Sequence, residues 1–318
     1  MLPKPPYFDA NVWGDDTWSL LSASYLGDLE TVRQLLEQDP GKIQAQFAYY
    51  EPIHYAVRGG KVDMVKMLLE YGAHPLSPGW TILGDETPLA KAKDRDRADL
   101  AELLSQAAGK LPAYQPPTAK PRTDEQKLDY QFQIACGYQV DRNIIDAILV
   151  KHPGWATVGL YEAVHHNRID IVKYLLQAGA DINGHMPWAC WLTPLMHALR
   201  YSQANWELAD LVIEQGFSVN SVNGLGMSAL HMAIVQDRVD ALDYLLNHGA
   251  DINIVDTEFC STSFGWTARW GKLEMAKKLL IRGADRNLSG ADSWARPILW
   301  AEKGNHEDIV SLLKGHSR

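Results

Sequence analysis

Apolar residues recur along most of this chain with the spacing of a helix that buries one face. The segments 171–176, 241–246 and 275–280 show this pattern, with charged or polar residues between the apolar ones. A glycine follows each segment within a few residues, and glycine readily takes the left-handed conformation that ends a helix. A shorter apolar segment precedes each one, across a short polar turn. Since short connections make neighbouring helices antiparallel, the pattern predicts a series of helix pairs.

Two phrases recur with these pairs. The first contains Gly179, Gly216, Gly249 and Gly283 at intervals of 37, 33 and 34 residues, followed in most copies by Ala-Asp-x-Asn. The second opens the shorter helices with Thr-Pro or a related step, as at Thr193-Pro194. Threonine can cap a helix N-terminus, and proline at the first helical position gives up an N–H that has no partner there. The interval therefore defines a repeating unit of two helices.

With both phrases at a period of about 33 residues, the sequence resembles the ankyrin repeat family from about Thr17 to Leu313. The resemblance implies an all-α fold, an ankyrin-repeat α-solenoid of about nine helix-turn-helix units with hairpin-like fingers. The fourth unit, Asp124–Pro153, lacks the Thr-Pro step and matches the family least well. The second helices of the pairs are expected at about 29–37, 62–71, 98–106, 142–151, 169–178, 206–215, 239–248, 273–282 and 306–314.

A proline-rich segment interrupts the array. Residues 108–123 hold four prolines and no apolar period, so an extended conformation is expected. We divide the chain into an N-terminal extension (1–16), about three repeats (17–107), a linker or insertion (108–123) and about six repeats (124–318), with a C-terminal cap at 293–318. Our interpretation is two sub-arrays in contact. The alternative is one unbroken stack that carries the proline-rich segment as a long finger.

The composition narrows the possible partners. The chain is 46% hydrophobic and 22% charged, and its 30 Lys and Arg residues against 39 Asp and Glu residues leave a net charge of −9. A negative net charge disfavours general binding to nucleic acid or anionic lipid. Neither a secretory signal nor an apolar run long enough to span a membrane is seen. We therefore expect a cytoplasmic monomer that binds protein or peptide, with no nucleic-acid or membrane partner.

No sequence motif indicates catalysis, a cofactor or a metal site. The nucleophile-elbow and phosphate-loop patterns are absent from the sequence. His165 and His166 are adjacent, so they point about 100° apart on a helix and cannot easily chelate one ion. The three cysteines are odd in number and scattered, which favours buried reduced thiols: Cys136, Cys190 and Cys260. The resemblance implies a structural role for the histidines at or next to the opening phrase, which are His54, His197 and His231.

Eleven tryptophans are the least ordinary feature of the sequence. Alignment to the repeat places Trp206, Trp266 and Trp300 at core positions. By the resemblance, the fingers and the ends of the first helices line a concave groove, and these places carry Trp80, Trp188, Trp191, Trp270 and Trp294.

The equivalent positions along the array form a candidate partner-binding set rich in Trp, Tyr and Arg, which are enriched among interface hot spots. The alternative for each aromatic residue is packing against the next finger. The set comprises Tyr49, Tyr50, Arg58, Arg95, His165, His166, Trp191, Arg200, Tyr201, Phe259, Arg269, Trp270 and Trp294.

The sequence thus predicts a non-enzymatic protein–protein interaction module that binds a partner protein or peptide in the concave groove. Two alternatives stay open. One is recognition of a small molecule or carbohydrate by an exposed tryptophan cluster, and the other is a targeting or effector protein.

Overall fold

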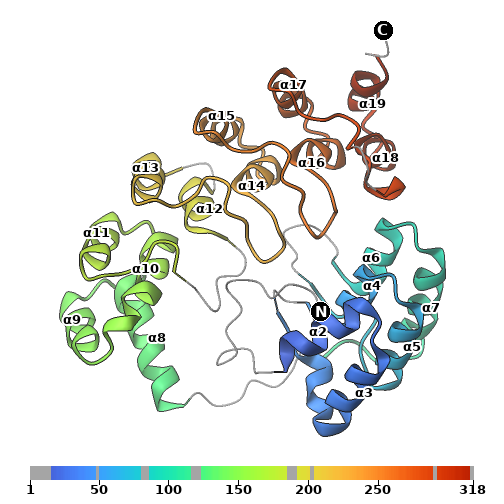
Figure 1. Ribbon diagram of the computed structural model, residues 1–318, viewed down its shortest axis with the longest axis horizontal. Coiled ribbons are helices and arrows are strands. Elements are labelled where there is room, and N and C mark those ends of the chain that lie inside the picture. The colour runs from blue at the N-terminus through green and yellow to red at the C-terminus, as the bar shows by residue number, and fades with distance from the viewer. Residues whose placement is uncertain are drawn as a thin grey trace. The chain divides into compact units, whose positions relative to one another are not determined.

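The computed structural model describes residues 16–47, 50–79, 86–115, 123–184, 192–200, 204–288 and 292–315. These residues form helices joined by loops, and the β-structure seen among them is limited to isolated bridges. The chain divides into two compact units, residues 1–119 (unit 1) and residues 120–318 (unit 2). Figure 1 labels the helices along the chain.

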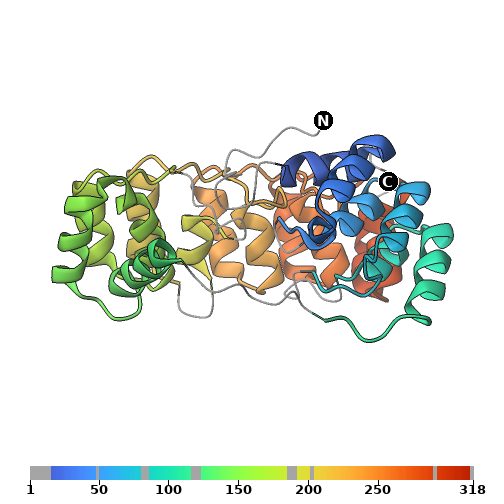
Figure 2. The same ribbon diagram turned by 90° about the horizontal axis from the view of Figure 1, so that it is seen from below.

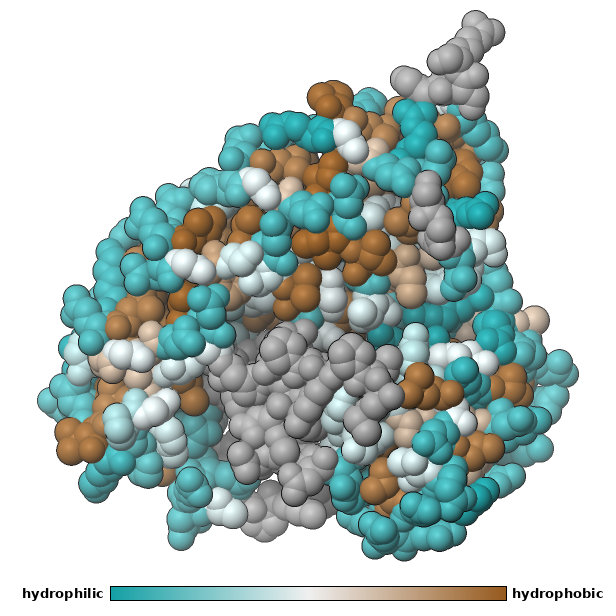
Figure 3. Space-filling model, in the orientation of Figure 1, coloured by the Kyte–Doolittle hydropathy of each residue, from teal (hydrophilic) through white to brown (hydrophobic). Residues whose placement is uncertain are grey.

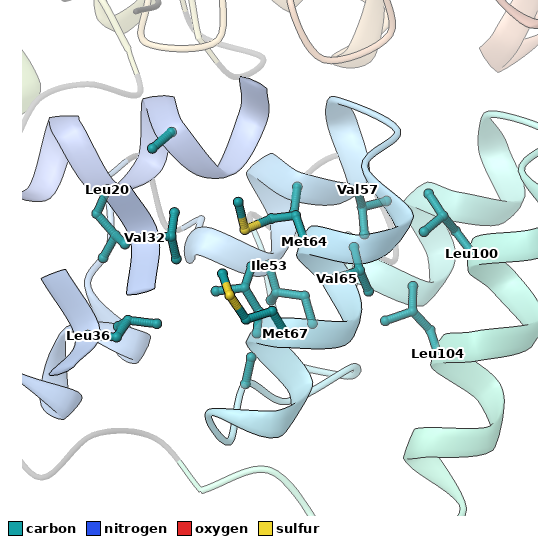
Figure 4. Close-up of a cluster of buried hydrophobic side chains, with 14 of the residues drawn as sticks. Leu20, Val32, Leu36, Ile53, Val57, Met64, Val65, Met67, Leu100 and Leu104 are labelled. Carbon is teal, nitrogen blue, oxygen red and sulfur yellow. The ribbon is translucent and has the colours of Figure 1, made fainter. Parts of the chain in front are cut away.

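Within its described residues, unit 1 contains three helix pairs and one short 3-10 helix, η1 (Pro40–Gln44). Apolar side chains from all three pairs meet in one core, shown in Figure 4, where Leu20, Ile53 and Leu104 mark the three pairs. The pairs are α2 (Thr17–Leu26) with α3 (Leu29–Gln38), α4 (Pro52–Arg58) with α5 (Val62–Glu70), and α6 (Pro88–Asp94) with α7 (Ala98–Ala108).

The described part of unit 2 contains six helix pairs and two 3-10 helices, η3 (Pro153–Trp155) and η4 (Ser293–Ala295). The first helices of successive pairs contact one another in order, which forms an inner row, and the second helices form an outer row (Figures 1 and 2). The pairs are α8 (Asp124–Cys136) with α9 (Arg142–Lys151), α10 (Ala156–His165) with α11 (Ile169–Gln177), α12 (Pro194–Leu199) with α13 (Trp206–Glu214), α14 (Ala229–Val235) with α15 (Val239–Asn247), α16 (Ser263–Trp270) with α17 (Leu273–Ile281), and α18 (Pro297–Lys303) with α19 (Glu307–Lys314).

The predicted all-α repeat fold is confirmed. Each expected second helix is present within two residues of its predicted bounds, including the poorly matching fourth pair at 142–151. That pair is opened instead by a capping box, in which Thr123 Oγ1 accepts from Gln126 N at 3.2 Å. The glycine after the second helix has a positive φ in five units, from 81° at Gly249 to 93° at Gly72, as the left-handed helix end requires.

Polar pairs join neighbouring outer helices in unit 2. Tyr244 Oη donates to Asp210 Oδ1 at 2.6 Å, and Lys278 Nζ lies 2.7 Å from Asp243 Oδ2. Along the outer edge of the same unit, hydrophilic residues are interspersed with apolar ones (Figure 3). These exposed pairs couple each repeat to the next, although pairs of this kind contribute little individually.

The start of the proline-rich segment lies on unit 1. His74 Nε2 lies 2.9 Å from the carbonyl oxygen of Pro112, and Tyr114 Oη donates to Glu51 Oε1 at 2.9 Å. Burial raises the pKa of Glu51. Residues 112–114 are therefore held by unit 1, while 116–122 lie outside the described residues, and the extent of a linker stays a prediction.

No helix within the described ranges combines the length and the apolar character needed to cross a bilayer.

Candidate functional site

The last two pairs of unit 2, together with the finger that precedes them, gather aromatic side chains around one arginine. We call this group the aromatic–arginine cluster. Phe259 lies in the finger that joins α15 to α16, and its ring centroid lies 5.4 Å from that of Trp266 and 5.5 Å from that of Trp270. The members are Phe259, Trp266, Arg269, Trp270, Trp294 and Trp300.

A buried carboxylate holds the finger in place. Asp256 accepts hydrogen bonds from the backbone N–H groups of Glu258 at 2.7 Å and Phe259 at 2.6 Å, and from Trp266 Nε1 at 2.7 Å. Its fourth donor is the N–H of Ser261 at 3.2 Å. Burial raises the pKa of Asp256 to about 6, although these donors act in the opposite direction. One side chain thus joins the finger to α16.

Arg269 lies among the aromatic rings. Its Cζ atom is 4.1 Å from the Phe259 ring centroid, 4.4 Å from that of Trp300 and 5.2 Å from that of Trp270. These distances are those of cation–π contacts. Trp294 approaches Trp300 edge-on, with their centroids 6.0 Å apart. Three aromatic rings therefore lie against the guanidinium.

The cluster has a buried base and a half-buried rim. Phe259, Trp266 and Trp300 are at most 2% exposed, whereas Arg269 and Trp270 are half-buried, as is Trp294. The core positions predicted for Trp266 and Trp300 are confirmed. Phe259 was expected to line a groove, but it is 1% exposed and packs against the helices beside it, which is the alternative kept for finger aromatics.

The expected core position of Trp206 is wrong. This side chain is 37% exposed and rests on Tyr244, with a centroid separation of 5.1 Å. Trp206 begins an outer helix, so its ring covers the neighbouring outer helix instead of entering the core.

A second group of predicted residues meets at the ends of α10 and α12. The His165 ring centroid lies 4.7 Å from those of both His166 and His197, and Arg200 Nη2 donates to the His165 carbonyl oxygen at 3.2 Å. Tyr161 Oη and His197 Nε2 are 2.5 Å apart. Burial lowers the pKa of His165 to about 4, and it also lowers the pKa of His197, so both imidazoles are neutral near pH 7.

Glu162 lies beside these histidines. Its Oε2 atom is 3.6 Å from His166 Nε2, and burial raises its pKa to about 7. Across the portion of the chain that the structure describes, no group of three or more His, Cys, Asp and Glu residues is arranged to hold a metal ion. The predicted pair His165 and His166 is thus part of a packed, largely neutral cluster.

The candidate residues of unit 1 are more buried than expected. Tyr50 is fully buried, and its ring centroid lies 4.1 Å from Lys91 Nζ, which pairs with Glu86 Oε2 at 2.6 Å. Arg95 is 6% exposed, although its position in the array placed it in the groove. Arg58 is half-buried, with Cζ 5.3 Å from the Tyr55 ring centroid. Finger packing within unit 1 therefore encloses side chains that the sequence placed at a surface.

Three of the candidates, Tyr49, Trp191 and Tyr201, lie outside the described residues, as do Trp80, Trp188 and Cys190.

The histidines of the opening phrase have the structural role that was predicted for them. His54 Nδ1 accepts from Glu51 N at 3.1 Å and its Nε2 lies 3.2 Å from Ser77 O. His231 is placed in the same way, with its Nδ1 accepting from Ser228 N at 3.1 Å. Of the thiols, Cys136 is buried, which raises its pKa to about 12, and Cys260 is half-buried.

Sequence reasoning missed the anchoring role of Asp256 and the enclosed Lys91–Glu86 pair. The sequence does carry one signal for Asp256, which is an aspartate inside a finger. Aspartate side chains often accept hydrogen bonds from the backbone of the next few residues in a turn.

Comparison with known proteins agrees with the repeat geometry. A family model described as ankyrin repeats in three copies matches residues 20–112 and 160–256. An ankyrin repeat protein of fowlpox virus is 31% identical over 56% of this chain and 49% of its own length. An ankyrin repeat and KH domain-containing protein of Caenorhabditis briggsae is 24% identical over 94% of this chain and 10% of its own length. A palmitoyltransferase of Homo sapiens is 29% identical over 26% of this chain and 13% of its own length. The chain thus spans half or less of the length of these relatives.

Proposed function

The chain belongs to the ankyrin repeat family, and from this premise we propose that it is a non-enzymatic module that binds a partner protein or peptide through the rim of the aromatic–arginine cluster. Ankyrin repeats mediate protein–protein interactions. The rim residues Arg269, Trp270 and Trp294 provide the main contacts.

The observation that carries this proposal is a half-buried rim of Trp, Trp and Arg above a fixed aromatic base. Large side chains of these types bury much area on binding and are enriched at hot spots. Because the base is packed and the finger is tied to α16 by Asp256, little conformational entropy is lost when a partner binds.

Other members of the candidate set fall into two roles. His165, His166 and Arg200 are further contacts along the inner row of unit 2, and Arg58 plays the same part in unit 1. Tyr50, Arg95 and Phe259 support the surface from beneath, because they are buried. The partner-binding roles of Tyr49, Trp191 and Tyr201 stay predictions.

The net charge of −9 supports a protein partner over nucleic acid or an anionic membrane surface. The cytoplasmic location and the monomeric state stay predictions.

The test compares single alanine variants in the full chain. Partners are first captured from cell extract with the wild type, and the dissociation constant of the main partner is then measured for Trp270→Ala, Trp294→Ala and Trp206→Ala. The first two are expected to weaken binding by about five-fold or more, which corresponds to about 1 kcal/mol or more, the loss seen when one of the few energetically important interface residues is truncated. Trp206→Ala is the matched control, because it removes a 37% exposed tryptophan from an outer helix of the same unit.

Circular dichroism checks that each variant is folded. Unchanged affinity in both rim variants would contradict the proposal, and so would a larger loss in the Trp206→Ala control than in either of them.

A further inference from the structure

The rings around Arg269 form a cage with three walls. The Phe259 ring plane lies at 83° to that of Trp300 and at 76° to that of Trp270, so the walls meet nearly at right angles. The Arg269 Cζ atom lies in this corner, within 5.2 Å of all three ring centroids. Aromatic faces carry negative electrostatic potential, and cages of this shape bind cations.

Two buried carboxylates in the finger that carries Phe259 add to the preference of the cage for positive charge. Asp256 and Glu258 are at most 1% exposed, and both belong to the finger that carries Phe259. Asp256 also accepts from Trp266 Nε1, and the Trp266 ring lies against Trp270 with centroids 4.8 Å apart. A carboxylate close to a site of low polarity favours a cation there. This preference is for charge in general and holds for any cation that fits the corner.

Two of the walls and their occupant differ in burial. Phe259 and Trp300 are buried and lie on the finger and on α18, whereas Arg269 belongs to α16. Arg269 is half-buried and lies on the last turn of α16, next to the half-buried Trp270. Its long, flexible side chain can therefore leave the corner while the walls stay in place.

We propose that this cage is a cation-recognition site in which a basic side chain of the partner, arginine or lysine, exchanges with Arg269. The proposal rests on the partner-binding function above and adds the chemistry of the bound group. Charge complementarity favours it, because the chain as a whole carries a net charge of −9.

The first experiment removes the occupant. Arg269→Ala in the full chain is titrated with methylguanidinium chloride, with tryptophan fluorescence as the readout, and with N-methylurea as a neutral molecule of similar shape. We expect saturable binding of methylguanidinium that is about ten-fold or more tighter than that of N-methylurea, as expected for a cation in a desolvated aromatic cage. The wild type is expected to bind methylguanidinium at least several-fold more weakly, because Arg269 competes for the corner.

Control variants keep this result interpretable. Lys303 Nζ lies 5.2 Å from the Trp300 centroid and can enter the emptied corner, so the double variant Arg269→Ala with Lys303→Ala is titrated in parallel. Adding Trp270→Leu to Arg269→Ala removes one wall and should weaken methylguanidinium binding, whereas adding Trp206→Leu should not. If Arg269→Ala is unfolded by circular dichroism, Arg269→Gln replaces it, because it removes the charge but keeps most of the stem.

The second experiment follows the exchange in the wild type. The Nε–Hε signal of Arg269 is recorded by NMR while the acetylated, amidated peptide Gly-Arg-Gly is added, with the citrulline peptide as the neutral control. We expect the ring-current-shifted signal to move toward its solvent position with the arginine peptide only.

Equal binding of methylguanidinium and N-methylurea in both Arg269→Ala and the Lys303 double variant would overturn the cage as a cation site. An unmoved Arg269 signal at saturating arginine peptide would overturn the exchange. Either failure, combined with loss of partner binding in Trp270→Ala, would leave the proposed function standing without this chemistry.

Discussion

At the scale of the residue, the ends of α10 and α12 show how burial sets charge in this protein. His165 and His197 are kept neutral because burial lowers the pKa of each imidazole, whereas burial raises the pKa of the Glu162 carboxyl group. The other ionisable groups that shift the pKa values of Glu162 and the histidines are Asp129, His166, Arg168 and Arg200, and Glu162 adds to the raised pKa of Cys136. The cluster is therefore most compatible with the folded state when Glu162 is protonated and the imidazoles are neutral.

This leads to a prediction about pH. The pKa of Glu162 in the folded chain, about 7, lies above its value in the unfolded chain. At pH values between these two pKa values the folded chain binds more protons than the unfolded chain, so the free energy of unfolding falls as pH rises. Glu162→Gln mimics the protonated form, and we expect it to raise the free energy of unfolding at pH 8 by about 1 kcal/mol, a value reduced for partial exposure to solvent. At pH 5 the difference should nearly vanish.

Urea unfolding at both pH values measures the effect, with the exposed Glu274→Gln as the control. The effect of His165 on the free energy of unfolding has the opposite pH dependence. Because burial lowers its pKa to about 4, the stability that its neutral form contributes is lost as pH falls from about 6.5. An equal effect of Glu162→Gln at pH 5 and pH 8 would contradict this assignment.

At the scale of the element, the finger before α16 is a short loop that one carboxylate organises. Its ends meet in a bridge between Val255 and Thr262, and Asp256 receives four donors inside it. The finger lies so close to α16 that a Cβ atom on Gly265 would come within 1.8 Å of Ser261 Oγ. Finger and helix therefore form one packed element that supports the aromatic–arginine cluster.

Replacing the organising carboxylate should loosen this element. In Asp256→Asn the new amide NH2 faces the two donors that Oδ2 now binds, Ser261 N and Trp266 Nε1, and the loss of such an acceptor costs about 1–3 kcal/mol. We expect the free energy of unfolding to drop by this amount in urea and the tryptophan emission to shift. Asp251→Asn is the matched control, because Asp251 is exposed and accepts from Asn253 N at 2.8 Å, a bond that the asparagine oxygen can keep.

Equal stability of the two variants would show that Asp256 does not anchor the finger.

The fold was predictable at this scale because its signals are local. Each second helix has its own apolar period, and in five units a glycine such as Gly249 or Gly283 ends it, so its bounds follow from one unit alone. The site was less predictable, because the exposure of a finger residue depends on the unit beside it. Phe259 packs against Trp266 and Trp300, and Tyr50 contacts Lys91 and Glu86. The spacing of apolar residues within one unit does not predict these contacts.

At the scale of the whole molecule, the repeats of unit 2 form a stack in which each pair contacts the next. Stability in such stacks comes from the units and their neighbour interfaces, so a surface at α16 and α18 can bind a partner without rearranging the other pairs. The outer row carries polar pairs between helices, whereas the aromatic–arginine cluster is built on inner helices and a finger. The central claim is that the partner contacts this cluster.

Hydrogen–deuterium exchange of the full chain, with and without its captured partner, tests that claim most directly. We predict slowed exchange on binding in the finger at 255–262, in the last turn of α16 and around η4, with little change in the outer helices α13, α15 and α17. Protection confined to those outer helices, with the finger and α16 unchanged, would contradict the account.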